Sequence, residues 1–425
     1  MVKKFSVAIL CMISFGVFAQ NGTISPYSFF GIGDSREGGT VENQMMGGLR
    51  MYADSIHVNL RNPAAYSELR LTAYSVGLSH REFRLKDFTE QQNTSVTNLD
   101  YLAIGLPVAK DVGVGFGIMP YSSVGYSLVQ NRLTTEGDSI TNVYSGEGGI
   151  NRVYASIGFR ALKNLTLGAT ANFNFGTLQY NRIQTIQDVQ FGTLDARSSR
   201  INGFDFNYTA NFTPKITEKL TLFSHLGVNT QLNLVSKNEE EIGSFNTQSG
   251  QNIELVEVDL EAQNLRNTEL KIPTVFTGGL GIGENKKWFL GAEYSAQQLS
   301  TFENAFLRLE NVEYQDASTI SVGGYYIPNY TSFSNVLNRI TYRAGLRYDQ
   351  TGMIVNGKEI NNFGITFGFG VPLVGVGTDR FSNLNIGFEL GRRGTTDANL
   401  VEESYFRLNL GLSFNSKWFQ KRQID

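Results

Sequence analysis

Three arginines recur at every fourth residue near the end of the chain: Arg339, Arg343 and Arg347. The even-numbered positions in the range 340–348 carry Ile, Tyr, Ala, Leu and Tyr. Alternate side chains of a β-strand point to opposite faces, so the arginines would share one face. Guanidinium groups bind carboxylates through paired hydrogen bonds. The spacing therefore indicates a strand whose polar face could bind an acidic head group.

Arg160 and Arg407 lie at similar positions on other predicted strands and are further candidates for this site. A second interpretation is that these arginines pair with acids on the same inner face, such as Glu389, Glu293 and Asp205, or hold a neighbouring segment in place. Charges inside a filled barrel need partners, so the alternative remains open.

Other reactive residues are sparse. The only cysteine is Cys11, and the histidines His57, His80 and His225 lie far apart without the spacing of metal ligands. No serine lies in a nucleophile elbow. Glycines at 113–117 and 364–370 are not followed by helices, so they do not form a phosphate-binding loop. We therefore expect no enzyme, no metal site and no cofactor, and we interpret these glycines as small positions facing a packed interior.

The elements that position the arginines show period-2 alternation of apolar and polar residues. It is clearest in the ranges 165–175, 204–212 and 406–414. A membrane barrel exposes the apolar set to lipid, whereas a soluble sandwich buries it in a core, so alternation alone does not separate the two. The predicted strands lie near 71–80, 99–108, 112–128, 152–161, 165–175, 203–212, 220–234, 273–282, 288–298, 319–326, 339–348, 363–371, 383–391 and 405–414.

The connections between these strands alternate in length. Long or polar connections are expected near 81–98, 129–151, 176–202, 235–270, 299–318, 349–362 and 392–404, and tight turns near 109–111 and 161–164. Outer-membrane barrels have short periplasmic turns and long external loops, and an even strand number returns both termini to the periplasm. The sequence therefore predicts an all-β fold: a closed, antiparallel transmembrane barrel of about fourteen strands.

The bulk properties agree with an outer-membrane location. The chain has 45 glycines, 30 phenylalanines and 19 tyrosines but only 8 prolines, and its net charge of −3 indicates no nucleic-acid partner. Beyond residue 20 no apolar run is long enough for a spanning helix. Lys3 and Lys4 precede an apolar run at 5–18, which predicts a signal peptide at 1–19.

The segment 20–69 differs from the barrel predicted at 70–415 and the periplasmic tail predicted at 416–425. It contains Gly47, Gly48, Asn62 and Pro63, with Met and Leu residues at near-helical spacing. These apolar residues need a packing surface, which indicates a hatch inside the lumen. A disordered periplasmic tail is the alternative.

Several pieces of the sequence, in order, resemble the FadL/TodX family of outer-membrane transporters for long-chain fatty acids and aromatic hydrocarbons, in its Bacteroidota form. The matching pieces are 46–48 with Asp54 and 62–64, 112–118 with Pro120, 146–149, 270–273, and the stretch from Tyr342 to Trp418. The resemblance implies a fourteen-stranded barrel with an N-terminal hatch. It also implies uptake of hydrophobic molecules and their release into the membrane through a gap near the third strand.

Pro120 gives such a gap a physical reason, because proline cannot donate to a strand ladder. We expect the third strand to be kinked or unpaired there. The alternative is that the strand ends at Pro120 and a loop begins.

Two functions of different class remain. The first is transport of a hydrophobic small molecule, which predicts a continuous apolar pocket and a lateral gap. The second is a non-transporting subunit of a secretion apparatus of the type IX kind, which binds a protein partner. It predicts a filled lumen, no lateral gap and an exposed apolar patch on the loops. A general porin predicts an open lumen, and the hatch argues against it.

Overall fold

The computed structural model describes residues 22–36, 38–133, 137–307, 311–332, 335–374 and 381–417. The predicted signal peptide at 1–19, with Cys11, lies outside the described residues, as does most of the predicted tail at 416–425.

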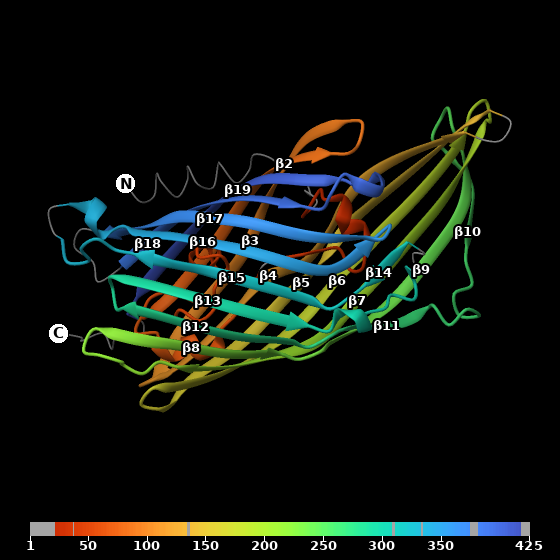
Figure 1. The fold of residues 1–425 in the computed structure, drawn as a ribbon. Helices are drawn as coiled ribbons and strands as arrows, with labels where there is room; N and C mark the ends of the chain where they lie inside the picture. Colours follow the sequence, from red (N-terminus) through yellow and green to blue (C-terminus); the bar gives the residue numbers. More distant parts are fainter. Residues whose placement is uncertain are drawn as a thin grey trace, which may run out of the picture.

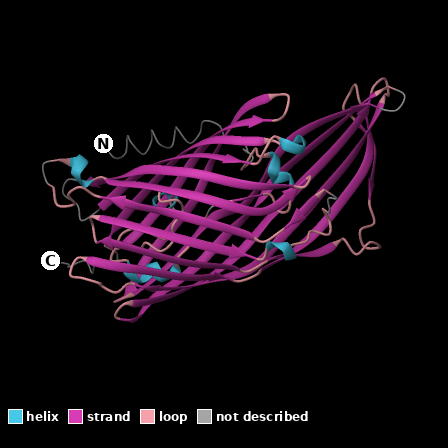
Figure 2. Cartoon of the chain, in the orientation of Figure 1, coloured by secondary structure: helices cyan, strands magenta, loops and turns pink. Residues whose placement is uncertain are grey.

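The described chain forms one nineteen-stranded sheet, closed into a barrel whose wall has fourteen antiparallel strands (Figures 1 and 2). The barrel closes because the last strand pairs with the first wall strand, Ser416 opposite Thr72 and Glu402 opposite Lys86. The wall consists of β2 (Thr72–Lys86), β3 (Gln91–Ala109), β4 (Val112–Leu133), β5 (Ser139–Leu162), β6 (Leu165–Ile186), β7 (Phe191–Phe212), β8 (Leu220–Asn229) continued by β9 (Leu232–Asn246), β11 (Asn267–Ile272) continued by β12 (Val275–Glu284), β13 (Trp288–Gln297), β15 (Ala317–Tyr326), β16 (Thr341–Val355), β17 (Lys358–Val374), β18 (Phe381–Arg393) and β19 (Glu402–Ser416). The closed barrel predicted from the sequence is confirmed.

The two faces of the wall differ as the alternation predicts. On β6, Phe173 and Phe175 are exposed on the outside, whereas Asn172 and Asn174, which alternate with them, are buried inside. Because the sheet is closed and its apolar side chains point outward, they meet lipid and do not form the core of a sandwich.

The prediction of long loops at 81–98, 129–151 and 176–202 is wrong, because strands occupy most of each range. β2 and β3 are joined by residues 87–90 only, and β6 and β7 by residues 187–190. The outer face of these segments lacks a regular apolar alternation, because beyond the lipid band it meets water, whereas main-chain pairing continues. We call this end of the barrel the loop end, and the end that contains the β3–β4 turn at 110–111 the turn end.

Part of the wall extends beyond the rest at the loop end (Figure 1). This projecting sheet consists of the ends of β4, β5, β6, β7 and β9 together with β10 (Asn252–Glu257), which pairs with β9. Two short strands complete the sheet: β1 (Asp34–Ser35) pairs with β4, and β14 (Val312–Tyr314) pairs with β16.

The N-terminal segment lies inside the barrel and packs against the wall. Its short helices are η1 (Pro26–Phe29), α2 (Val41–Gln44) and η2 (Pro63–Glu68), and the loop helices are η3 (Leu299–Thr301), η4 (Val336–Arg339) and η5 (Asp397–Asn399). Leu49 and Ala64 have no exposed surface, and η2 contacts β4, β5 and β6. Among the described residues, no helix has the length and apolar character to cross a bilayer.

Wall glycines make room for this segment. A Cβ atom at Gly168 would overlap the backbone of Ala64, and one at Gly113 would overlap the carbonyl oxygen of Tyr66. The wall also holds the segment by a side chain, since the Glu293 carboxylate accepts hydrogen bonds from the backbone N–H groups of Arg50 and Met51 at 2.7 and 2.6 Å.

Candidate functional site

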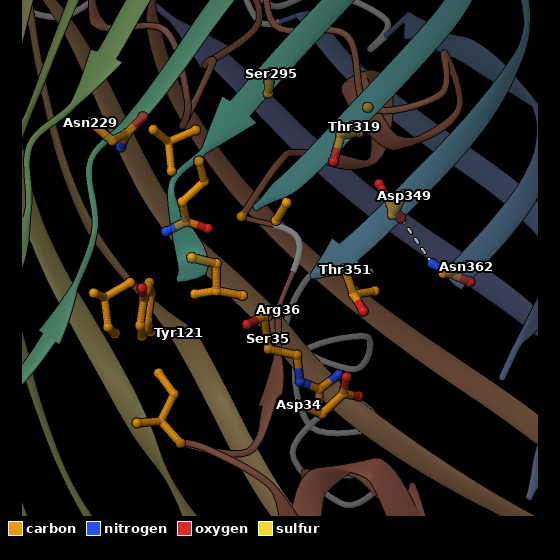
Figure 3. Close-up of a pocket in the computed structure, with 18 of the residues that line it drawn as sticks. Asp34, Ser35, Arg36, Tyr121, Asn229, Ser295, Thr319, Asp349, Thr351 and Asn362 are labelled. Atoms are coloured by element: carbon orange, nitrogen blue, oxygen red, sulfur yellow. Dashed lines mark hydrogen bonds between the residues drawn. The ribbon is translucent and has the colours of Figure 1, made fainter. Parts of the chain in front are cut away.

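A cavity of about 490 Å³ lies inside the barrel between the N-terminal segment and the wall. Figure 3 shows Asp34, Ser35 and Arg36 at its centre, with Tyr121 on one side and Asp349 and Asn362 on the other. Apolar residues line part of the cavity: Tyr27, Phe30, Ile32, Leu60, Met119, Leu232, Ile272, Leu299, Phe302 and Met353. Charged residues, uncharged polar residues and glycines line the rest, so the apolar lining is not continuous as the transport hypothesis predicts.

The cavity borders the part of the wall where β3 and β4 are not paired with each other, which we call the opening. The ladder between these strands runs from Ala109 opposite Val112 to Leu102 opposite Ile118 and extends no further. β4 stays paired with β5 beyond this point, with an irregularity between Pro120 and Ser122. Pro120 lies two residues past the last β3–β4 pair and lines the cavity. β4 is therefore unpaired from β3 at Pro120 but continues as a strand.

The N-terminal segment fills the base of this opening. Asp34 and Ser35 of β1 pair with Ser123 and Ser122 of β4, and the backbone N–H of Arg36 donates to the carbonyl oxygen of Tyr121 at 2.9 Å. The segment thus acts as an added strand along β4.

Ion pairs anchor β1 to the far side of the opening. Arg393 of β18 lies 2.6 Å from Asp34 and 3.0 Å from Glu403, and Arg81 of β2 lies 4.0 Å from Asp34. Burial alone would raise the pKa of Asp34, but Arg393 and Arg81 outweigh it and lower the pKa to about 2. Burial and the nearby Arg81 lower the pKa of Arg36 to about 10, so Arg36 stays charged at neutral pH.

Two of the predicted head-group arginines line the cavity, and acids are paired with both. Arg347 lies 3.0 Å from Glu389 and 2.9 Å from Asp349, and Arg407 lies 3.3 Å from Asp100. The geometry agrees with the alternative interpretation, in which inward arginines satisfy inward acids.

The other three candidates lie elsewhere. Arg160 is at the turn end, 2.6 Å from Glu68. Arg343 is buried against Asn385 at 3.0 Å. Arg339 ends η4 instead of starting a strand, because β16 begins at Thr341, and it does not line the cavity.

The hatch residues singled out from the sequence are all in contact with the wall or the cavity. The N–H of Gly47 donates to Thr366 at 3.0 Å, and Gly48 lines the cavity. The Asn62 side chain donates to the Asn211 side chain of β7 at 3.2 Å, and a Cβ atom at Gly158 of β5 would overlap the carbonyl oxygen of Pro63.

Sequence reasoning missed most of the charged cluster around β1. Arg393 and Arg81 were not singled out, although both follow the alternation of their strands. Asp34 lies outside the predicted strands, and no local pattern identifies it as the partner of either arginine. Within the described ranges, no group of three His, Cys, Asp or Glu side chains could hold a metal ion.

A second surface lies on the outer face of the projecting sheet. Val129, Val143, Ile183 and Leu194 are directly opposite one another across β4, β5, β6 and β7, and Leu255 of β10 continues the row through Gly243 of β9. Val129 is 63% exposed and Leu255 is 45% exposed. We call these five side chains the apolar row.

The apolar row is separate from the lipid-facing surface. On β6 the polar residues Thr177, Gln179 and Asn181 lie on the same face between Phe175 and Ile183. Eight residues of strand span roughly 26 Å. The row therefore stands above the apolar band of the barrel.

The comparisons with known proteins agree with this architecture. The model of the BamG family matches residues 1–425. The chain belongs to the BamG family. No curated protein matches the sequence.

This BamG-family chain has the fold of outer-membrane hydrocarbon channels. The Pseudomonas putida toluene transporter TodX is 16% identical with a TM-score of 0.57, and the alignment covers 91% of this chain and 99% of TodX. A Pseudomonas aeruginosa FadL homologue is 11% identical with a TM-score of 0.55, covering 89% and 98% of the two chains. The CymD monoaromatic hydrocarbon channel is 13% identical with a TM-score of 0.53, covering 90% and 98%. The resemblance to the FadL/TodX family is thus confirmed at the level of the fold, whereas the family is BamG.

Proposed function

We propose that this chain is a barrel subunit of an outer-membrane protein machine, and that it binds a protein partner at its loop end. The apolar row carries this proposal. Contiguous apolar side chains outside the lipid band are energetically unfavourable in water unless a partner covers them. Such patches mark interaction sites. In this proposal the loop end faces the outside of the cell and both termini face the periplasm.

The interior supports the same function. The arginines that line the cavity on β16 and β19 are already paired with acids, and the N-terminal segment meets the wall at glycine positions without space between them. The name of the BamG family hints at an assembly complex as the partner. A secretion apparatus of the type IX kind is a narrower form of the same proposal.

The test is the size of the particle that contains the chain after gentle solubilisation of native outer membranes. We expect the wild-type chain in a complex, measured by native mass spectrometry, and the double variant V143K/I183K as the free barrel. The matched control is Asn181→Lys, which adds charge to the same face outside the apolar row and leaves the complex intact. A wild-type chain that is recovered only as the free barrel would overturn the proposal.

Transport of a hydrophobic molecule is the second candidate, because the cavity reaches the opening between β3 and β4 at Met119, Pro120 and Tyr121. The cavity lining is part apolar and part charged and contains more arginines than acids, which suits a fatty acid better than toluene. The test is uptake of dodecanoate and of toluene into liposomes that contain the purified barrel. Uptake that is no faster than through empty liposomes would exclude this candidate.

A further inference from the structure

Two long strand edges face each other across the opening without pairing. β3 pairs with β2 as far as Gln91, and β4 pairs with β5 as far as Leu133, so each strand is fixed along one side. On the other side, their mutual ladder ends at Leu102 and Ile118. We call the free edge of 91–101 on β3, together with the free edge of 119–133 on β4, the seam.

The separation of the strands is built into their backbones. On β3, Asp100 has no partner on β2, because Tyr101 pairs with Gly77 and Leu99 with Leu78. On β4, Tyr121 is likewise skipped between Pro120 and Ser122. Each extra residue is a β-bulge, and bulges bend a strand, so β3 and β4 part from each other beyond these positions while each stays paired on its other side. Asp100 is held by Ser79 at 2.9 Å and by Arg407 at 3.3 Å, so the bulge on β3 is anchored.

Between its limits, where Asp100, Pro120 and Arg132 lie, the seam carries none of the side chains that protect free edges. Such edges normally contain lysine, other charges or proline, which prevent pairing with another chain. Residues 91–99 read QQNTSVTNL and residues 121–131 read YSSVGYSLVQN, without a charge or a proline. Unpaired main-chain groups along a regular strand are a template for a further strand.

The chain itself shows that the edge of β4 accepts a strand. β1 pairs there with Ser122 and Ser123, and the N–H of Gly125 donates to the Ser28 side chain at 3.1 Å. Among the described residues, no strand pairs with this edge of β4 between Val124 and Leu133. The added strand is therefore short, and in the described part of the chain the edge beyond Gly125 has no strand paired with it.

We propose that the seam binds an extended segment of the protein partner by β-augmentation, continuing the strand that β1 begins. This inference rests on the proposed function and names its contact. Main-chain hydrogen bonds supply the binding energy, and pockets for alternate side chains supply specificity. Tyr126 and Leu128 point inward into an apolar cluster with Leu178 and Phe29, so the partner segment carries apolar residues at alternate positions and no charge against the seam.

Hydrogen–deuterium exchange tests this contact. The complex from native outer membranes is compared with the same chain produced without its partner. We expect amide exchange in 91–99 and 126–133 to be at least tenfold slower in the complex. Peptides of β16 and β17, which are paired on both sides, serve as the internal reference.

Substitutions give the second measurement. The variant S95K/S127K adds a charge at an exposed position on each edge. We expect its seam amides to exchange as fast as in the free chain, and the yield of the complex to fall at least tenfold. The matched control Thr177→Lys lies exposed on β6, which is paired on both sides, and leaves both unchanged.

The outcomes separate the two proposals. A complex whose seam amides exchange as fast as in the free chain overturns strand binding and leaves the proposed function intact. The absence of any complex overturns both. If the seam amides of the purified chain exchange slowly without the partner, and this slow exchange is lost on dilution, the seam binds a second copy of this chain. This result also overturns the inference.

Discussion

Arg393 and Asp34 form an ion pair with a distance of 2.6 Å between Nη1 and Oδ1, although they are 359 positions apart in the chain. Arg393 lies on the wall strand β18, whereas Asp34 lies on β1, which fills the base of the opening between β3 and β4. The pair therefore ties the segment that closes the wall to the wall itself.

Removing this tie is expected to release β1. Arg393→Ala leaves the Asp34 and Glu403 carboxylates buried without their main partner, and breaking a buried pair in this way costs about 3–5 kcal/mol. We expect amides in 30–36 to exchange at least tenfold faster, measured by hydrogen exchange. Arg392→Ala is the control, because Arg392 is an exposed neighbour that pairs with Glu402. Equal exchange in the two variants would show that Arg393 does not hold β1.

Enlarging a wall glycine is expected to displace the N-terminal segment. A valine at Gly168 would overlap the backbone of Ala64, which cannot move without shifting η2. We expect Gly168→Val to raise the ion conductance of the barrel in planar bilayers several-fold. Gly278→Val is the control, because the nearest atom to an added Cβ there is 3.8 Å away. An unchanged conductance in a folded Gly168→Val barrel contradicts the prediction.

The Glu293 carboxylate is expected to stabilise the turn from Arg50 to Met51. Glu293→Ala leaves two buried N–H donors unsatisfied, at a cost of about 1–3 kcal/mol each. We expect the variant to unfold at a lower temperature, measured by the mobility shift of heated samples in electrophoresis. Glu293→Gln keeps one acceptor oxygen and should lie between the wild type and the alanine variant. An alanine variant as stable as the wild type would rule out this role.

The N-terminal segment is expected to loosen at alkaline pH. His57 Nδ1 lies 2.5 Å from Asp54 Oδ2, and Glu42 and Arg343 also face this site. Burial would lower the pKa of His57, but Asp54 and Glu42 outweigh it and raise the pKa above its ordinary value of 6.5. Burial would raise the pKa of Asp54, but His57 and two backbone N–H donors lower it to about 2.

The signs of these shifts fix the pH window. The contribution of His57 is complete below pH 6.5 and is lost as the pH rises through its raised pKa. The contribution of Asp54 is complete above 3.8, its ordinary value, and is lost as the pH falls toward 2. We expect amides in 52–60 to exchange faster at pH 9 than at pH 5.5, after correction for intrinsic rates. His57→Gln should remove this difference, and His80→Gln, at an exposed hydrogen bond to Thr97, should retain it.

Sequence patterns located most of the wall. The alternation at 165–175 and 406–414 assigned each side chain to the outside or the inside, because the period of a strand records which face meets lipid. The same patterns extended only partly into the projecting sheet, because its outer face lies beyond the lipid band and lacks a regular apolar alternation. The loops expected at 129–151 and 176–202 were wrong for this reason.

The sequence by itself determined that the chain is a closed barrel with apolar residues outside, and that Arg347 and Arg407 face inward. Only the tertiary structure decided that β3 and β4 part beyond Leu102 and Ile118, and that Arg393 meets Asp34. Alternation is a local property, encoded residue by residue, whereas the partner of a strand edge or a buried charge depends on residues that the fold brings together from distant parts of the chain.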